Sequence, residues 1–249
     1  MLVYMNPQNP SAQDLEEILR KNLFLVKTAL DWVVEYAIDK GVKSETFVFV
    51  PKIWQDDAFL ITKGKDEENA EVSTSLKTAE VFIPLARIDN LHDILHESIH
   101  RLAILQMDLS SNKLFFQIAN TFDFDLVLKN KKDINPTTFD IVLPSPGDYQ
   151  IAKNHLIEVY QRFLEGITEW ATQFTNTLSR EHGYALFEDL SAKYSTEVLV
   201  IEKMKNTLIS KGYSQDHANA VLIQTALTCD AEILKEKLKG DFLKYLNDF

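Results

Sequence analysis

The stretch from Asp89 to Leu102 constrains the fold of this chain more than any other, because it combines helical apolar spacing with two histidines one turn apart. His96 and His100 are four residues apart, so on a helix both imidazoles project from one face and can reach the same cation. Glu97 directly follows the first histidine, where its carboxylate can take a proton from a metal-bound water. This is the His-Glu-x-x-His spacing of zinc hydrolases, and it predicts a zinc site with Glu97 as general base.

The residues around this motif favour a helix with one buried face. An apolar stripe follows the helical period and is formed by Leu91, Ile94, Leu95, Ile99 and Leu102. The stripe places the histidines at the edge of a core, and Asp89 or Asn90 is expected to cap the helix. A motif this short also arises by chance, so a helical interaction protein that binds no metal is an alternative.

Length and composition limit the classes of protein that need to be considered. At 249 residues and 45% hydrophobic content, the chain can bury a core as one large domain or two subdomains. The formal net charge of -11 argues against a nucleic-acid-binding surface, which needs clustered lysine and arginine. We find no secretory signal and no apolar run that could cross a bilayer, so we expect no membrane partner and a cytoplasmic location, with export lacking a cleaved signal as the alternative. The single cysteine, Cys229, suits a reducing compartment and is expected to be a small buried residue rather than a nucleophile.

The hydrophobic pattern of the first half predicts a helix followed by a sheet. Apolar residues recur at helical spacing from residue 11 until Gly41, which is expected to end a long helix. The period then changes to two, which predicts the strands of an antiparallel or mixed sheet at 46–50, 58–62, 71–76 and 80–83.

The second half is predicted to be mostly helical. Residues 113–118 fit a strand or a helix equally, whereas 122–128 and 139–143 alternate like strands. The remaining apolar pattern predicts helices at 148–180, 195–210, 214–228, 231–239 and 241–249. The fold class expected is therefore α+β, with a C-terminal part that is nearly all helical.

A catalytic zinc site with two histidines needs a third protein ligand, and a glutamate pair provides candidates. Glu165 and Glu169 are four residues apart on one helical face, so one carboxylate can bind the metal while the other orients a ligating imidazole. Gly166 is expected to let this helix approach the histidine helix closely. The alternative is a solvated helix face, and Glu158, seven residues before Glu165, is the fallback ligand.

Other residues compete for supporting roles. His92 lies one turn before His96, too far along the helix axis to share the metal easily, and is expected to be structural or to support a ligand. Tyr194 is the first candidate for stabilising a developing oxyanion, ahead of His182 and Arg101, although packing at a helix start would explain it equally well.

Together these motifs resemble the glutamate zincins (gluzincins), metallopeptidases in which a His-Glu-x-x-His helix is joined by a glutamate from a later helix. The segment Glu165-Gly-Ile-Thr-Glu169 matches the ligand glutamate, the following glycine and the acidic residue one turn on. With 194–198 and 229–234 it also resembles a group of little-characterised bacterial proteins regarded as zinc peptidases. The resemblance spans about 89–238, but 64 residues lie between His100 and Glu165, more than in the most compact members.

The resemblance implies a single zincin-like domain over 1–249. Its upper subdomain, 1–110, would hold the sheet and the histidine helix, and its lower, mostly helical subdomain, 111–249, would hold the glutamate helix. The implied activity is zinc-dependent hydrolysis of a peptide or protein substrate, with Zn²⁺ held by His96, His100 and Glu165 and supported by Glu169. An edge strand would hold the extended substrate. The rival is a non-catalytic zinc-binding or relic module of the same fold that engages a partner protein.

Overall fold

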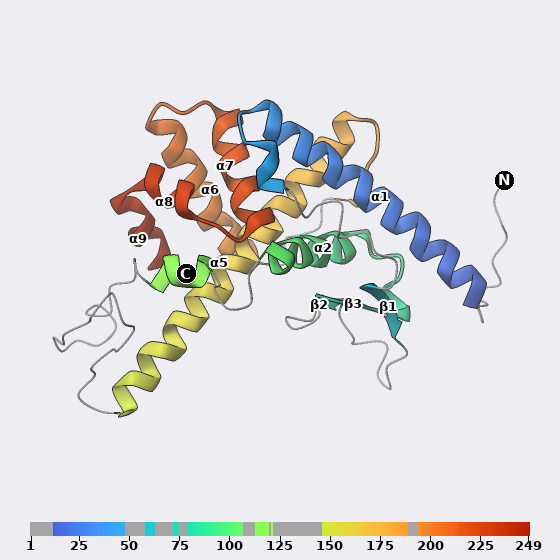
Figure 1. The fold of residues 1–249 in the computed structure, drawn as a ribbon, viewed down its shortest axis with the longest axis horizontal. Helices are drawn as coiled ribbons and strands as arrows, with labels where there is room; N and C mark the ends of the chain where they lie inside the picture. Colours follow the sequence, from blue (N-terminus) through green and yellow to red (C-terminus); the bar gives the residue numbers. More distant parts are fainter. Residues whose placement is uncertain are drawn as a thin grey trace.

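The computed structural model describes residues 12–47, 58–62, 72–74, 79–106, 113–119, 121, 146–188 and 194–249. These residues form an N-terminal helix, a small three-stranded mixed sheet and a helical C-terminal part (Figure 1). The α+β class and the predominance of helix are therefore confirmed. The strands predicted at 122–128 and 139–143 lie outside the described residues, and the division into two subdomains stays a prediction.

Helix α1 (Ala12–Asp39) confirms the long helix predicted from the apolar spacing. It buries one stripe of apolar side chains, including Val26, Leu30 and Val33, in the common core. Gly41 then adopts a φ of +100°, a conformation that glycine reaches without steric cost. The predicted helix end at this glycine is thus correct.

The sheet is mixed, which is the second of the two arrangements expected, antiparallel or mixed. Strand β3 (Val81–Pro84) lies in the middle, parallel to β1 (Phe59–Thr62) and antiparallel to the two-residue β2 (Ser73–Thr74). Alternating side chains determine which face of a strand is buried, but strand direction depends on the path of the connections. The start of the strand predicted at 46–50 was wrong. Residues 46 and 47 belong instead to the 3-10 helix η1 (Ser44–Phe47), which buries the Phe47 side chain.

Helix α2 (Leu91–Gln106) carries the histidines and lies between the sheet and the other helices (Figure 1). Asn90 caps it: the Asp93 backbone N–H donates to Asn90 Oδ1 at 3.1 Å, and Asn90 Nδ2 donates to Asp93 Oδ2 at 2.8 Å. The apolar stripe is buried as expected except at its start, where Leu91 is half-buried, and Ile94, Ile99 and Leu102 are fully inaccessible to solvent. Because this stripe is buried, the adjoining face of α2, which carries the histidines, lies at the edge of the core.

Helix α5 (Pro146–Glu181) runs through the helical part (Figure 1). It carries Glu165 and Glu169. It packs against α1, α2, α3 (Lys113–Ala119), α6 (Ser195–Ser210) and α7 (Gln215–Thr228). The ambiguous stretch at 113–118 is therefore helical. Helices α8 (Glu232–Leu238) and α9 (Gly240–Leu246) complete the predicted C-terminal series. No helix in the described part of the chain is long and apolar enough for a membrane span.

Gly166 allows a close helix approach, but against a different neighbour from the one expected. A Cβ atom at this position would lie 2.8 Å from Glu197 Cβ and 3.1 Å from the Glu197 carbonyl carbon. The missing side chain therefore lets α6, rather than α2, approach α5. Helical spacing could not identify the partner, because α5 is surrounded by several helices.

We expect Gly166→Ala to lower the free energy of unfolding by about 1 to 2 kcal/mol, because the overlap with Glu197 outweighs the better helix propensity of alanine. Gly240→Ala is the matched control: Gly240 begins α9, and a Cβ there would meet nothing within 4 Å. Urea unfolding of both variants measures the effect. Equal stability of the two variants would show that α6 can move away without cost.

Candidate metal centre

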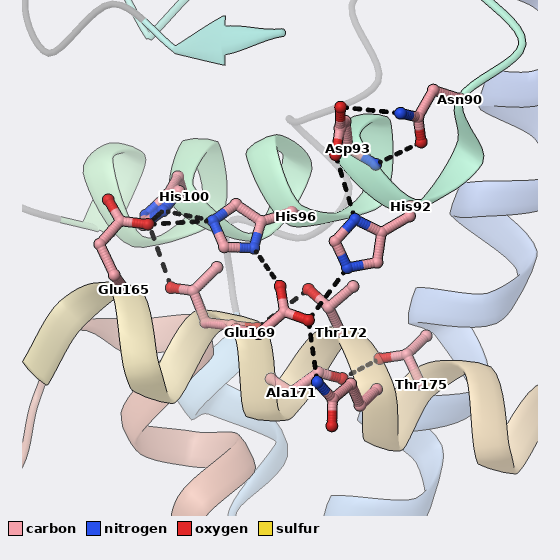
Figure 2. Close-up of polar contacts among 12 residues, drawn as sticks. Asn90, His92, Asp93, His96, His100, Glu165, Glu169, Ala171, Thr172 and Thr175 are labelled. Carbon is pink, nitrogen blue, oxygen red and sulfur yellow. Dashed lines mark hydrogen bonds and ion pairs between the residues drawn. The ribbon is translucent and has the colours of Figure 1, made fainter. Parts of the chain in front are cut away.

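Helices α2 and α5 bring His96, His100 and Glu165 together, as Figure 2 shows. Glu165 Oε2 lies 3.1 Å from His96 Nε2 and 3.3 Å from His100 Nε2, and the two imidazole nitrogens are 3.1 Å apart. Zinc with four ligands at about 2.0–2.1 Å separates the ligand atoms by roughly 3.3 Å. The three donor atoms therefore have the mutual spacing that a shared zinc ion requires.

The opposite ring nitrogens of both histidines have partners that turn Nε2 toward the common point. His96 Nδ1 lies 3.1 Å from Glu169 Oε2, and His100 Nδ1 lies 3.5 Å from the Thr168 hydroxyl. Such contacts select the tautomer and orient the ring of a metal-binding histidine. The donor set and its supports thus fit a zinc ion, and Glu169 lies where the sequence placed a supporting acid.

Glu169 is 1% exposed and joins two histidines across the interface between α2 and α5 (Figure 2). Its Oε1 lies 3.0 Å from His92 Nε2 and accepts a hydrogen bond from Gln173 Nε2 at 2.9 Å, while Oε2 faces His96. His92 also lies 3.1 Å from Asp93 through Nδ1. His92 is therefore a partner of Glu169 and not a member of the candidate metal group of His96, His100 and Glu165.

These contacts keep the groups charged while no metal is bound. Burial opposes protonation of His92, but hydrogen bonds to Asp93 and Glu169 outweigh it and raise the pKa of His92 to about 9. Burial likewise opposes protonation of His96, but Glu165 and Glu169 raise its pKa to about 9. Burial would raise the pKa of Glu169, yet the imidazoles lower it to about 2. The two histidines of the metal group lower the pKa of Glu165 in the same way.

We expect the metal-free protein to be most stable between pH 4.5 and pH 6.5. The lower limit is the ordinary pKa of a glutamate and the upper limit that of a histidine. The histidines have raised pKa values, so their contribution is complete below 6.5 and is lost as the pH rises through about 9. The glutamates have lowered pKa values, so their contribution is complete above 4.5 and is lost toward pH 2.

Thermal unfolding in a chelator across this pH range measures the effect. Zinc-saturated protein is the control, because zinc needs neutral imidazoles and its stabilisation should instead increase with pH. A melting temperature of the metal-free protein that rises from pH 6.5 to pH 9 would contradict the charged network.

Glu97 lies beside the metal-binding group at the wall of a cavity of about 280 Å³, which His100 and Glu165 also line. Thr74 on β2 donates its hydroxyl to Glu97 Oε2 at 2.7 Å and lies 3.0 Å from the Glu97 carbonyl oxygen. The hydroxyl holds one carboxylate oxygen of the expected base. Sequence reasoning missed Thr74, because a lone threonine in a two-residue strand belongs to no motif.

The structure places one of the three oxyanion candidates at the site. The Tyr194 ring stacks on the His96 imidazole, with centroids 5.8 Å apart and planes 16° apart. Tyr194 precedes α6 with a φ of +62°, in the left-handed region. The Arg101 guanidinium instead lies over the Phe59 ring, 5.7 Å from its centroid.

The other residues considered from the sequence lie outside the group. His182 stacks on Trp32 with centroids 4.3 Å apart, and the fallback ligand Glu158 is exposed on α5 and does not join the cluster. Cys229 is buried at the end of α7, and burial raises the pKa of its thiol to about 12. It is therefore a packing residue, as predicted.

The chain matches no known protein family, no curated protein and no solved structure. A function for this protein therefore has to be argued from the site itself. The site combines a buried His-His-Glu group that could hold a metal ion with a neighbouring glutamate and a cavity.

Proposed function

We propose that this protein is a zinc-dependent metallopeptidase with a zincin-like fold, in which His96, His100 and Glu165 hold the zinc. The observation that carries the proposal is the mutual spacing of 3.1–3.3 Å among the three donor atoms. Two imidazoles and one carboxylate are a donor set typical of catalytic zinc, which leaves the fourth position open. Bound zinc would supply Lewis-acid chemistry, lowering the pKa of a water and polarising a scissile carbonyl.

Glu97 is proposed to act as the general base. It follows a metal-binding histidine without belonging to the group, and it faces the cavity that His100 and Glu165 also line. Its carboxylate would accept a proton from the attacking water and pass that proton to the leaving amine. Thr74 holds Oε2 of this carboxylate, which leaves Oε1 to exchange the proton.

Tyr194 is proposed to donate a hydrogen bond to the developing oxyanion. Its ring packs on the His96 imidazole, which supports a place for the phenol at the edge of the metal site. Thr168 and Glu169 would hold the two imidazoles in the orientation that metal binding needs.

The proposed substrate is an extended peptide with a medium-sized apolar side chain. The lining of the cavity beside Glu97 includes Ala103, Ile104 and Leu164, which suit an apolar group. Among the strands that the structure describes, β2 lies at an edge of the sheet and carries Thr74, so a peptide pairing with β2 would lie next to the base.

The test combines metal content with cleavage. Protein stripped with a chelator, incubated with zinc and dialysed should hold about one zinc per chain by elemental analysis. The loaded protein should then cleave members of a peptide library, read by mass spectrometry, next to apolar residues. Protein that stays metal-free overturns the proposal. One retained zinc without any cleavage would favour the non-catalytic zinc-binding module instead.

A further inference from the structure

A second cavity, of about 420 Å³, lies between α1, α5, α6 and α7. It shares no residue with the metal-binding group. Its wall combines aromatic rings with acidic side chains, contributed by Tyr36, Trp170, Phe174, Glu181, Glu202 and Asp216. This composition is unlike that of the apolar cavity beside Glu97, and the proposed peptidase mechanism does not use it.

The aromatic rings form one continuous wall. Trp170 stacks on Phe174 with centroids 5.4 Å apart and planes 17° apart, and Tyr36 packs against Phe174 with centroids 5.2 Å apart. The faces of aromatic rings carry negative partial charge and attract cations. The protein's own cations already use this property, because Lys205 Nζ lies 5.7 Å from the Trp170 ring and Lys40 Nζ lies 5.6 Å from the Tyr36 ring.

The charged lining adds to this attraction. Three carboxylates line the cavity against one ammonium, that of Lys205, which gives a formal charge of -2 (one minus three). Glu202 pairs with Lys205 at 2.5 Å and accepts a hydrogen bond from Trp170 Nε1 at 2.6 Å. Asp216 accepts from the Tyr36 hydroxyl at 3.0 Å and pairs with Lys40 at 3.1 Å on the protein surface. Exposed pairs of this kind contribute little, so a ligand cation can compete for Asp216.

Asn219 supplies an independent indication of a missing donor. Its side chain lines the cavity, is only 5% exposed, and donates through Nδ2 to the Tyr36 hydroxyl at 3.3 Å. Its Oδ1 is buried and has no hydrogen-bond partner among the described residues. A buried acceptor without a partner costs free energy. The oxygen is closed to solvent, so a ligand N–H would pair with it, and recover that cost, once the Asn219 side chain rotates toward the cavity.

We propose that this cavity binds a guanidinium group, the side chain of an arginine in a peptide. Guanidinium is planar, so it can stack on one of the two rings, Tyr36 or Phe174, whose planes are 58° apart. It also presents five N–H donors to carboxylate and amide oxygens. An ammonium group presents three donors from a single point and does not stack. The site is distinct from the metal centre, although Gln173 lines this cavity and donates to Glu169.

The test uses the full chain and N-acetyl-L-arginine amide as the probe, with N-acetyl-L-citrulline amide as a neutral probe of the same shape. Titration is followed by NMR through the Trp170 indole N–H, which is assigned with Trp170→Phe. We expect saturable binding of the arginine probe with a Kd on the order of 1 mM, and binding of the citrulline probe at least about tenfold weaker. No saturable shift of this signal, or equal shifts with both probes, would overturn the proposal.

Two charge-removing variants locate the site. Glu181 is exposed and lines the cavity, so the Glu181→Gln variant should fold normally and bind the arginine probe about threefold or more weakly. Glu236 is exposed on α8 away from the cavity, so Glu236→Gln removes the same charge and should leave the Kd unchanged. An equal rise in the Kd of the arginine probe in both variants would show that the probe is attracted only by the net negative charge of the protein, and would overturn the proposed site. Equally tight binding of N-acetyl-L-lysine amide would contradict recognition of guanidinium.

Discussion

Glu165→Ala should nearly abolish zinc retention, whereas Glu169→Ala should weaken zinc affinity only about ten- to a hundredfold. Glu165 Oε2 faces both His96 Nε2 and His100 Nε2, so its removal leaves two imidazoles and no anionic ligand. Glu169 contacts His96 through Nδ1, on the far side of the ring from the proposed ion. Its loss frees the orientation of one ligand but removes none.

Competition with a zinc chelator measures both affinities, and circular dichroism checks that each variant is folded. Glu158→Ala is the matched control, because Glu158 is exposed on the same helix and should leave zinc affinity unchanged. Loss of zinc from Glu169→Ala together with retention by Glu165→Ala would invert the two roles. Unchanged affinity in both variants would place the third ligand elsewhere.

Glu97→Gln should keep its zinc and lose peptidase activity by a factor of about a hundred or more. The change preserves the shape of the side chain and the contact from Thr74, but an amide cannot accept the proton of an attacking water. Zinc content should be normal, because Glu97 is not part of the His96, His100 and Glu165 group. Elemental analysis and the initial rate of peptide cleavage measure the two properties separately.

Thr74→Val is the companion variant for this result. It keeps Glu97 but removes the hydroxyl that holds Oε2, so a smaller loss of turnover is expected, with recovery in Thr74→Ser. Cleavage by Glu97→Gln at the wild-type rate would show that another group activates the water.

The helices and the grouping of the candidate metal ligands could be predicted from the sequence because both depend on short-range spacing. The apolar period locates α1, α2 and α5, and the four-residue intervals place His96 with His100 and Glu165 with Glu169 on shared faces. Polar side chains on two buried helix faces need a metal ion or polar partners, which is why the sequence predicts that these two faces meet. The contact of Glu169 with His96 then follows from one further helical turn.

Features that depend on how distant elements pack could not be predicted. The parallel pairing of β1 with β3 depends on the connection path, and the contact of Gly166 with Glu197 depends on which helix covers that side of α5. The hydrogen bond from Thr74 to Glu97 joins a two-residue strand to a helix. The cavity proposed to bind guanidinium is lined by Tyr36, Trp170 and Asp216 from three different helices, and no sequence motif links these residues.

The contacts of Glu165 and Glu169 join three successive turns of α2 to α5, at His92, His96 and His100 (Figure 2). One turn of an α-helix advances about 5.4 Å along its axis, so a slip of α5 past α2 by a single turn would move both glutamates away from their present partners. The two glutamates therefore hold the axial register of the two helices, and with it the distance of Glu165 from His96 and His100. A substitution that changes this register would alter the spacing of the donor atoms even from a distant position on either helix.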